Sequence, residues 1–286
     1  MTGLSRLAAT LGLALLLFSL APAHAQAPWQ SLPVPPPLPA LATQGHVDRD
    51  GARIWYGMVG KGLPVVLLHG GMASADSWGF EVAPLVRAGH RVILIDSRGQ
   101  GRSSMPAGAL HYAAMASDVI AVLDRLHVRR ADIVGWSDGA IVSLIIAIEH
   151  PERLRHVFAF GANMDLTGFN PDADKSPMIP RIDAALRASF AHVAPGRDYD
   201  AMARAVFAMQ GSEPTYSAAQ LAAIRGPRIL IADGEHEEFI ARSHTDYLAK
   251  TIPGARLLIL PGVSHFAPWQ RPEAFTRAVL DFLQRP

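Results

Sequence analysis

The stretch ADIVGWSDGAIVSLIIAIEH, residues 131–150, places Ser137 between a short apolar run and a long one. Gly135 and Gly139 lie two residues before and two residues after this serine. Small residues at these positions allow a sharp turn from strand to helix, in which larger side chains would collide. Such a turn presents the serine hydroxyl at the carboxyl edge of a sheet. The stretch therefore predicts a buried strand, a tight turn that carries Ser137, and a helix.

Apolar runs of strand length recur along the chain and alternate with helical patterns. Continuous apolar runs are typical of central parallel strands, and their alternation with helices predicts an α/β fold. The expected strands cover residues 53–59, 64–69, 91–96, 131–135, 156–160, 228–232 and 255–260. The expected helices between them cover residues 78–88, 112–126, 140–149, 244–251 and 273–284.

The alternation is interrupted between Asn163 and Pro227, where helical patterns such as RIDAALRASF and YDAMARAVFAM occur without a strand. An insertion at this point lies above the carboxyl ends of the strands, where open α/β sheets bind ligands. We therefore expect a small helical cap over about residues 164–227.

The first 25 residues have the pattern of a secretory signal peptide, with Arg6 before an apolar run and an A-x-A cleavage site at Ala25. A membrane anchor is the alternative, but the run is shorter than the roughly 20 residues of a spanning helix. We expect a mature protein that begins at Gln26, is exported to the periplasm or secreted, and has no stable membrane insertion. Residues 26–44 are rich in proline and predict an extended tether, followed by one domain over residues 45–286.

Composition excludes several classes of partner and cofactor. Lys+Arg 26 against Asp+Glu 25 provides no single-sign field, so we expect no nucleic-acid partner. With Cys 0, neither a disulfide nor a lipid-modified cysteine is possible. His236 and Glu237 begin the zinc pattern H-E-x-x-H, but its last position holds Ile240, so no metal is expected. The segment RGQGRSS lacks the spacing of a phosphate-binding loop, and no cofactor is expected.

A serine hydroxyl is a weak nucleophile at neutral pH, so Ser137 requires a histidine base and an acid that orients it. His265 lies in PGVSHFAPW, after the last expected strand. Glu235, Glu237 and Glu238 follow the strand RILIA. These residues occur in the order serine, acid, histidine.

Five motifs of the chain resemble the α/β-hydrolase superfamily: HGG, DSRGQGRS, GWSDG, DGEHEEFI and GVSHF, in this order from His69 onward. The resemblance extends over nearly all of the chain after Gly45. Within the superfamily, GWSDGA followed by FGAN is similar to the biphenyl-hydrolase-like group, which includes valacyclovir hydrolases. The resemblance implies a mostly parallel eight-stranded sheet flanked by helices, with a small helical cap inserted after strand 6. It also implies a cofactor-free serine hydrolase that cleaves carboxylic esters.

The resemblance assigns the acid to Glu237, at a position where aspartate is commoner, and leaves Glu238 as the second candidate. An oxyanion hole needs backbone N–H groups, and the residue after the nucleophile usually provides one of them. We therefore expect the N–H groups of Asp138 and Gly71 to form it.

Three residues are predicted to contact substrate: Met72 beside the oxyanion loop, Trp136 beside the turn, and Asp138. The carboxylate of Asp138 is a candidate partner for the protonated amine of an amino-acyl ester. The expected partner is a small ester, and the oligomeric state stays open. The alternatives are a cofactor-free perhydrolase of the haloperoxidase type, a hydroxynitrile lyase, and a non-catalytic binding protein.

Overall fold

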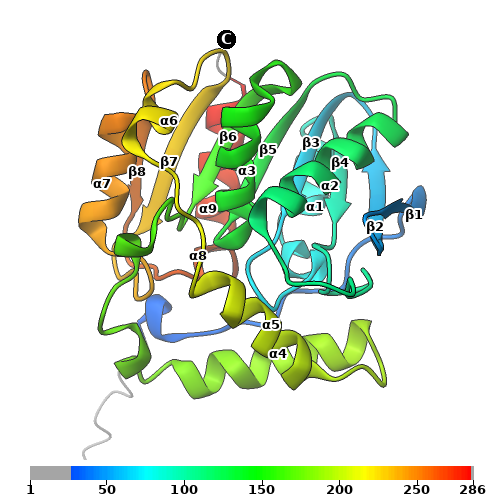
Figure 1. Cartoon of the computed structure of the whole chain (residues 1–286), viewed down its shortest axis with the longest axis horizontal. Coiled ribbons are helices and arrows are strands. Elements are labelled where there is room, and N and C mark those ends of the chain that lie inside the picture. The colour runs from blue at the N-terminus through cyan, green and yellow to red at the C-terminus, as the bar shows by residue number, and fades with distance from the viewer. Residues whose placement is uncertain (1–26, 285–286) are drawn as a thin grey trace, which may run out of the picture.

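An eight-stranded sheet forms the centre of the computed structural model, which describes residues 27–284 (Figure 1). The predicted signal peptide, residues 1–25, lies outside the described residues. The strand order is β1-β2-β4-β3-β5-β6-β7-β8, and β2 is antiparallel to both of its neighbours while the pairs from β4 to β8 are parallel. The predicted mostly parallel, eight-stranded sheet is confirmed. Its strands are β1 Thr43–Arg49, β2 Ala52–Gly60, β3 Leu63–Leu68, β4 His90–Ile95, β5 Ala131–Trp136, β6 Leu154–Phe160, β7 Arg228–Gly234 and β8 Arg256–Leu260.

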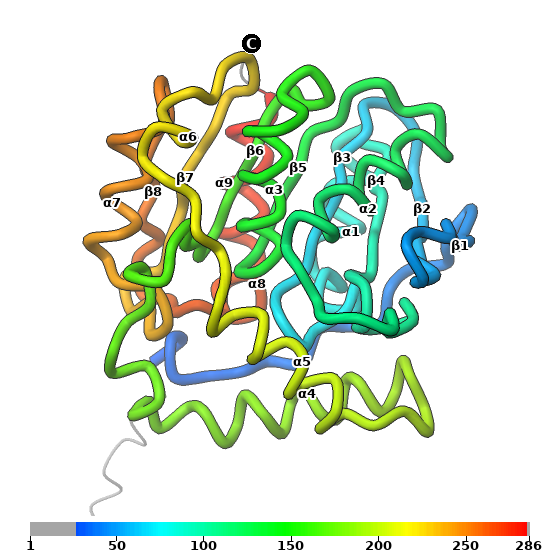
Figure 2. The backbone as a smooth tube through the Cα atoms, in the orientation of Figure 1, coloured from blue at the N-terminus to red at the C-terminus, as the bar shows by residue number. Residues whose placement is uncertain are grey.

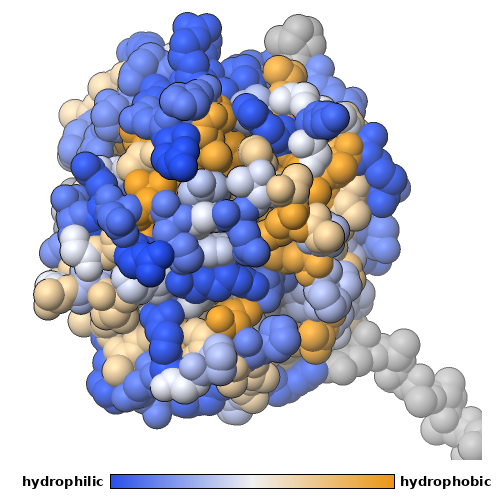
Figure 3. Space-filling model, turned by 90° about the vertical axis from the view of Figure 1, so that its right-hand side faces the viewer, coloured by the Kyte–Doolittle hydropathy of each residue, from blue (hydrophilic) through white to orange (hydrophobic). Residues whose placement is uncertain are grey.

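Strand β1 has no counterpart among the strands predicted from apolar runs, because its sequence TQGHVDR is mostly polar. It forms one edge of the sheet, and only Gly45 and Val47 are half-buried. Polar side chains on an edge strand oppose pairing with another chain. Hydrophilic residues cover most of the face of the molecule on this side, with apolar residues in smaller patches (Figure 3).

Helices cover both faces of the sheet, as the alternating pattern predicts. The helices α2 (Tyr112–Arg125), α3 (Asp138–Glu149) and α7 (Arg242–Thr251) lie on the face that is turned to the viewer in Figure 1. The helices α1 (Val82–Arg87) and α9 (Pro272–Leu283) lie behind it. Every residue of α3 from 138 to 147 is buried, which explains why this helix is apolar on all sides.

The predicted helical cap follows β6, as expected. Its long helices α4 (Ile179–Val193) and α5 (Tyr199–Gln210) lie across the carboxyl ends of the strands, at the bottom of Figure 1. The short helix α6 (Ala218–Ala222) belongs to the predicted cap range but contacts α7 on the main domain. No helix within residues 27–284 is both long enough and apolar enough to cross a membrane.

The predicted tether begins with the 3-10 helix η1 (Pro28–Gln30), packs on the domain instead of leading away from it, and ends within β1. Figure 2 shows this chain, in blue, between α4 and the main domain. We call residues 28–38 the strap. Its leucines Leu32 and Leu38 pack against the core. Within residues 27–284, the carbonyl groups of the strap have no partner in the sheet. Side chains of Arg181 and Gln270 donate hydrogen bonds to three of them instead.

Candidate active site

The predicted strand, turn and helix around Ser137 are confirmed. Ser137 lies between β5 and α3 with φ 55° and ψ −122°, a conformation that is strained for a residue with a side chain. A Cβ atom on Gly135 would lie 2.3 Å from the carbonyl oxygen of Gly139. A Cβ atom on Gly139 would lie 2.1 Å from the carbonyl oxygen of Leu68. The two glycines therefore let the turn close against β3.

The loops after β7 and β8 bring Glu237 and His265 together. Both carboxylate oxygens of Glu237 lie 2.9 Å from Nδ1 of His265, and the two side chains are only 5% and 6% exposed. The Glu237 carboxylate also accepts hydrogen bonds from the N–H groups of Phe239 (2.7 Å) and Ile240 (3.1 Å). These bonds fix the carboxylate against the imidazole, so that Nδ1 carries the proton and Nε2 is free to accept one.

Glu238, the second candidate for the acid, contacts the main chain of the histidine loop instead of the ring. Its carboxylate accepts hydrogen bonds from the N–H group of His265 (3.0 Å) and from the hydroxyl of Ser264 (3.2 Å). The structure thus places both glutamates beside His265, with Glu237 alone bonded to its imidazole among residues 27–284.

Burial controls the charge of this pair. Burial raises the pKa of Glu237 to about 7. Hydrogen bonds from Asp233 and from two backbone N–H groups lower this pKa but do not cancel the effect of burial. Burial also lowers the pKa of His265 below the ordinary value of 6.5, although the negative charge of Glu238 opposes this shift. An imidazole with a lowered pKa is uncharged at neutral pH and is able to take a proton from a serine hydroxyl.

Gly161, directly after β6, makes room for the ring of His265. Its φ is +67°, and a Cβ atom there would lie 2.7 Å from Cε1 of His265. On another side, the indole of Trp136 donates a hydrogen bond of 2.8 Å to the carbonyl group of His265. Gly161 stands directly after the apolar run HVFAF, and a glycine at the end of a strand is the sequence signal for this close contact.

Replacing Gly161 with alanine is expected to lower kcat at least about tenfold, because the new methyl group displaces the imidazole and a catalytic group that is about 1 Å out of place is much less effective. The measurement is kcat for an ester substrate. Gly196→Ala is the matched control, since Gly196 also has a positive φ of 78° but no atom within 4 Å of the added Cβ. Equal kcat values for the two variants would contradict the proposed crowding.

The predicted oxyanion loop follows β3 and lies against the turn that carries Ser137. The buried ring of His69 accepts a hydrogen bond from the N–H group of Ser97 at Nε2 (3.0 Å), so Nδ1 donates to the carbonyl group of Gly70 (2.7 Å). Burial lowers the pKa of His69, which favours this neutral form. Met72 has φ 61°. A Cβ atom on Gly71 would lie 2.7 Å from Oδ2 of Asp138, so glycine is needed at this close approach.

Asp138 is buried and has one bonded and one unbonded carboxylate oxygen. Oδ1 accepts hydrogen bonds from the hydroxyl of Tyr112 (2.7 Å) and from Nε2 of Gln210 in the cap (3.0 Å). Oδ2 has no hydrogen-bond partner within residues 27–284. Burial raises the pKa of this carboxyl group. Sequence reasoning missed Tyr112 and Gln210, because neither lies in a motif near the serine.

A cavity of about 180 Å³ joins these groups. Ser137 and His265 line it, together with the three predicted substrate contacts Met72, Trp136 and Asp138. Its lining contains the carboxyl groups of Asp138 and Asp183 but no lysine or arginine. The remaining walls are mainly apolar side chains that sequence reasoning did not single out: Phe169, Ile179, Ile182, Leu186, Phe207, Phe239, Ile240 and Phe266.

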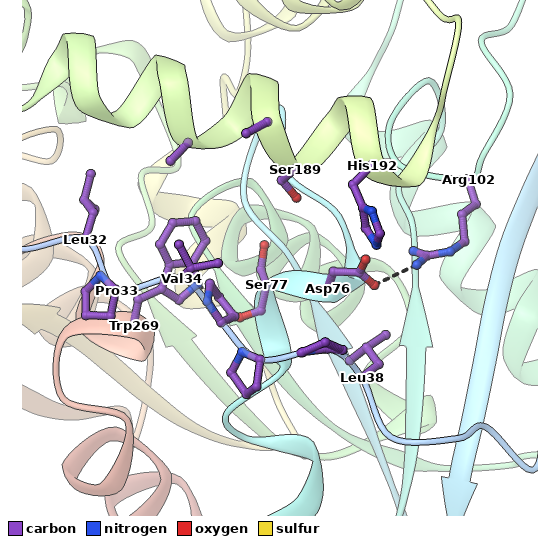
Figure 4. A pocket seen from close by; sticks show the side chains of 15 residues that line it. Leu32, Pro33, Val34, Leu38, Asp76, Ser77, Arg102, Ser189, His192 and Trp269 are labelled. Carbon is purple, nitrogen blue, oxygen red and sulfur yellow. Dashed lines mark hydrogen bonds and ion pairs between the residues drawn. The ribbon is translucent and has the colours of Figure 1, made fainter.

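A larger cavity of about 560 Å³ lies between the strap and α4 (Figure 4). Leu32, Val34 and Trp269 line it, with the ion pair between Asp76 and Arg102 at one side. None of the residues predicted to be catalytic lines this cavity, so the smaller one is the candidate substrate site. No group of histidine, aspartate and glutamate side chains in the described part of the chain has the arrangement of a metal site.

Comparison with known proteins agrees with this geometry. The model of the alpha/beta hydrolase family matches residues 65–278. Serine hydrolase BPHL of Mus musculus is 27% identical over 258 residues, which cover 85% of this chain and 87% of the relative. The 2-hydroxy-6-oxo-6-phenylhexa-2,4-dienoate hydrolase of Burkholderia cepacia is 26% identical and covers 81% of this chain and 91% of its own.

A solved structure is also similar. It is described as Est816, an N-acyl homoserine lactone degrading enzyme, and has a TM-score of 0.72, 29% identity, and coverage of 83% of this chain and 100% of its own. The eight-stranded sheet, the turn at Ser137 and the family match over most of the chain lead to one conclusion. The chain is an enzyme of the hydrolase class and belongs to the α/β-hydrolase family.

Proposed function

We propose that the protein cleaves carboxylic esters through Ser137, His265 and Glu237. The observation that carries the proposal is the buried pair of Glu237 and His265, whose histidine lines the same cavity as Ser137. Relatives support this reaction class, because one is named a serine hydrolase and another degrades a lactone, which is a cyclic ester.

The reaction has two steps. Oγ of Ser137 attacks the ester carbonyl while Nε2 of His265 takes the hydroxyl proton, and Glu237 stabilises the imidazolium. The N–H groups of Gly71 and Asp138 stabilise the oxyanion. The alcohol leaves with the proton from His265, and the acyl group stays on Ser137. Water then loses a proton to His265 and attacks the acyl-enzyme, which releases the carboxylic acid and restores Ser137.

The charge of the cavity restricts the substrate. Asp138 and Asp183 line it without a lysine or arginine, so an anionic group close to the reacting ester has no counter-charge. The relative from Burkholderia cepacia is named for a dienoate, which is an anion. We propose neutral or cationic esters for the present enzyme.

Within this class, amino-acyl esters fit the free oxygen of Asp138. A substrate ammonium group bonded to Oδ2 would satisfy a buried polar atom that has no partner within residues 27–284. The hydrogen bonds of Oδ1 with Tyr112 and Gln210 hold the carboxylate in place for such a contact.

Asp138→Asn is expected to reduce the preference for an amino ester over its des-amino analogue by roughly 10- to 100-fold, because a hydrogen bond to a charged group contributes about 1.5–3 kcal/mol. Asparagine retains an oxygen for Tyr112 and does not change the backbone N–H. The measurement compares kcat/KM for glycine and valine benzyl esters with the des-amino esters. Equal kcat/KM for both ester types in the unsubstituted enzyme would refute amine recognition.

The reaction class itself is tested with p-nitrophenyl esters and a fluorophosphonate that labels activated serines. We expect turnover, a burst of p-nitrophenol, and a mass increase at Ser137. Turnover with cyanide release from a cyanohydrin but no acyl-enzyme would show a lyase. Faster acyl transfer to peroxide than to water would show a perhydrolase, and absence of both labelling and turnover would leave a binding protein.

A further inference from the structure

Gln270 connects the strap with the loop that carries His265. It lies at the end of the short helix α8 (Ala267–Gln270) and is only 8% exposed. Its Nε2 is 3.2 Å from the carbonyl oxygen of Trp29 and 3.1 Å from that of Ser31. On the other side, its Oε1 accepts a hydrogen bond from the N–H group of Ser264 (2.7 Å), and its Nε2 lies 2.9 Å from the hydroxyl of Ser264.

The hydrogen bonds continue from Ser264 to the candidate base. The Ser264 hydroxyl donates a hydrogen bond of 3.2 Å to one carboxylate oxygen of Glu238. The other oxygen of Glu238 accepts a hydrogen bond of 3.0 Å from the N–H group of His265. An unbroken series of bonds therefore extends from the strap carbonyl groups through Gln270, Ser264 and Glu238 to the main chain of His265. Because these groups are mostly buried, the loss of one leaves its partners unsatisfied.

The strap also contacts the loop that carries the acid. The ring of Trp29 stacks on that of His236, with ring centroids 4.5 Å apart and an angle of 23° between the planes. His236 precedes Glu237, and its N–H group bonds the carbonyl group of Val263 in the histidine loop (2.9 Å). One turn of the strap thus contacts both loops of the proposed pair.

The hydrogen bonds that side chains of the domain donate to the strap reach its first residues. Arg181 of the cap donates a hydrogen bond to the carbonyl group of Gln30 (2.8 Å). Farther along, the larger cavity separates Val34 and its neighbours from α4 (Figure 4). Residues 29–31 are therefore the part of the strap that is built into the active-site loops.

We propose that residues 29–31 of the strap and Gln270 position the catalytic histidine. Glu238 completes this series of hydrogen bonds, because it accepts one from Ser264 and one from the main chain of His265. The inference rests on the proposed triad. Catalytic groups must be held within about 0.5 Å of their productive geometry, so a constraint on the loop acts on kcat. None of these three parts touches the substrate cavity, so KM is not expected to change.

Gln270→Met tests the link with a side chain of similar size that makes no amide hydrogen bonds. We expect kcat to fall about tenfold and KM to stay within twofold, since only the geometry of the base changes. Gln44→Met is the matched control, because Gln44 is exposed on β1, and it is expected to have the kcat of the unsubstituted enzyme. A normal kcat for Gln270→Met would overturn the proposal.

Glu238→Gln provides a readout that a loss of stability alone does not produce. The titratable groups that act on His265 are Glu237, Glu238, Asp233 and Asp138. The charge of Glu238 raises the pKa of His265, so its removal is expected to lower the pH at which kcat/KM declines on the acid side. Glu235→Gln, which removes an exposed charge nearby, is expected to leave that pH unchanged. If kcat fell but kcat/KM still declined at the same acidic pH as in the unsubstituted enzyme, Glu238 would only stabilise the fold.

A double-mutant cycle tests whether the ring of Trp29 acts through His236, on which it stacks. Trp29→Ala is expected to lower kcat several-fold, and the variant with both Trp29→Ala and His236→Ala is expected to match His236→Ala alone within about twofold. Multiplied effects would overturn this link, as would a normal kcat in Trp29→Ala. Circular dichroism checks each fold. Failure of the proposed function is a separate result, because then Ser137→Ala would retain turnover.

Discussion

Ser137→Ala is expected to lower kcat for ester hydrolysis by at least about 10⁴-fold, because no acyl-enzyme forms without the hydroxyl. The methyl group of alanine fits the turn, and the backbone strain at φ 55° is unchanged, so the fold is expected to stay intact. The measurement is steady-state turnover of p-nitrophenyl esters, together with labelling by a fluorophosphonate.

Ser189→Ala is the matched control for this prediction. Ser189 lines the larger cavity between the strap and α4, so its replacement removes a hydroxyl from a site without catalytic groups. We expect normal turnover from this variant. Loss of activity in Ser189→Ala and retention in Ser137→Ala would assign the chemistry to the other cavity.

Glu237→Gln is expected to lower kcat by about 10³- to 10⁴-fold, as for the acid of other serine triads. An amide nitrogen beside Nδ1 of His265 donates a hydrogen bond where the carboxylate accepts one. The imidazole then carries its proton on Nε2 and is unable to take the proton of Ser137. The measurement is kcat at a pH above the range in which activity declines on the acid side.

Glu238→Gln provides the comparison for the second candidate acid. Glu238 bonds the N–H group of His265 and not its ring, so this variant is expected to retain far more activity than Glu237→Gln. The reverse order of the two activities would show that Glu238 serves as the acid.

The local elements of this fold were predictable because short-range patterns specify them. Continuous apolar runs gave seven of the eight strands, and two glycines around Ser137 predicted the turn that the structure contains. β1 was not predicted, since a polar edge strand has no apolar run. The proline-rich segment was predicted to be an extended tether, but Pro28–Gln30 form a 3-10 helix and the segment packs on the domain. Composition alone does not specify where such a chain lies.

The choice between Glu237 and Glu238 depended on the path of a loop. Adjacent side chains in sequence point in different directions, and the N–H groups of Phe239 and Ile240 fold back on Glu237. That turn directs Glu237 to the imidazole and Glu238 to the main chain. The catalytic role of Glu237 stays a prediction, while its contact with His265 is a property of the structure.

The sequence by itself determined the chain order of strands β2 to β8 and their alternation with helices, the helical cap, the serine turn and the chain order of serine, acid and histidine. Periodicity and the steric needs of a tight turn act within a few residues, so they can be recognised in the sequence. Tertiary structure alone decided the hydrogen bonds of Asp138 with Gln210, of Trp136 with His265 and of Gln270 with Trp29, which join residues 72, 129 and 241 positions apart. Such bonds form only after packing brings distant segments together, because neither partner carries a local signal for the other.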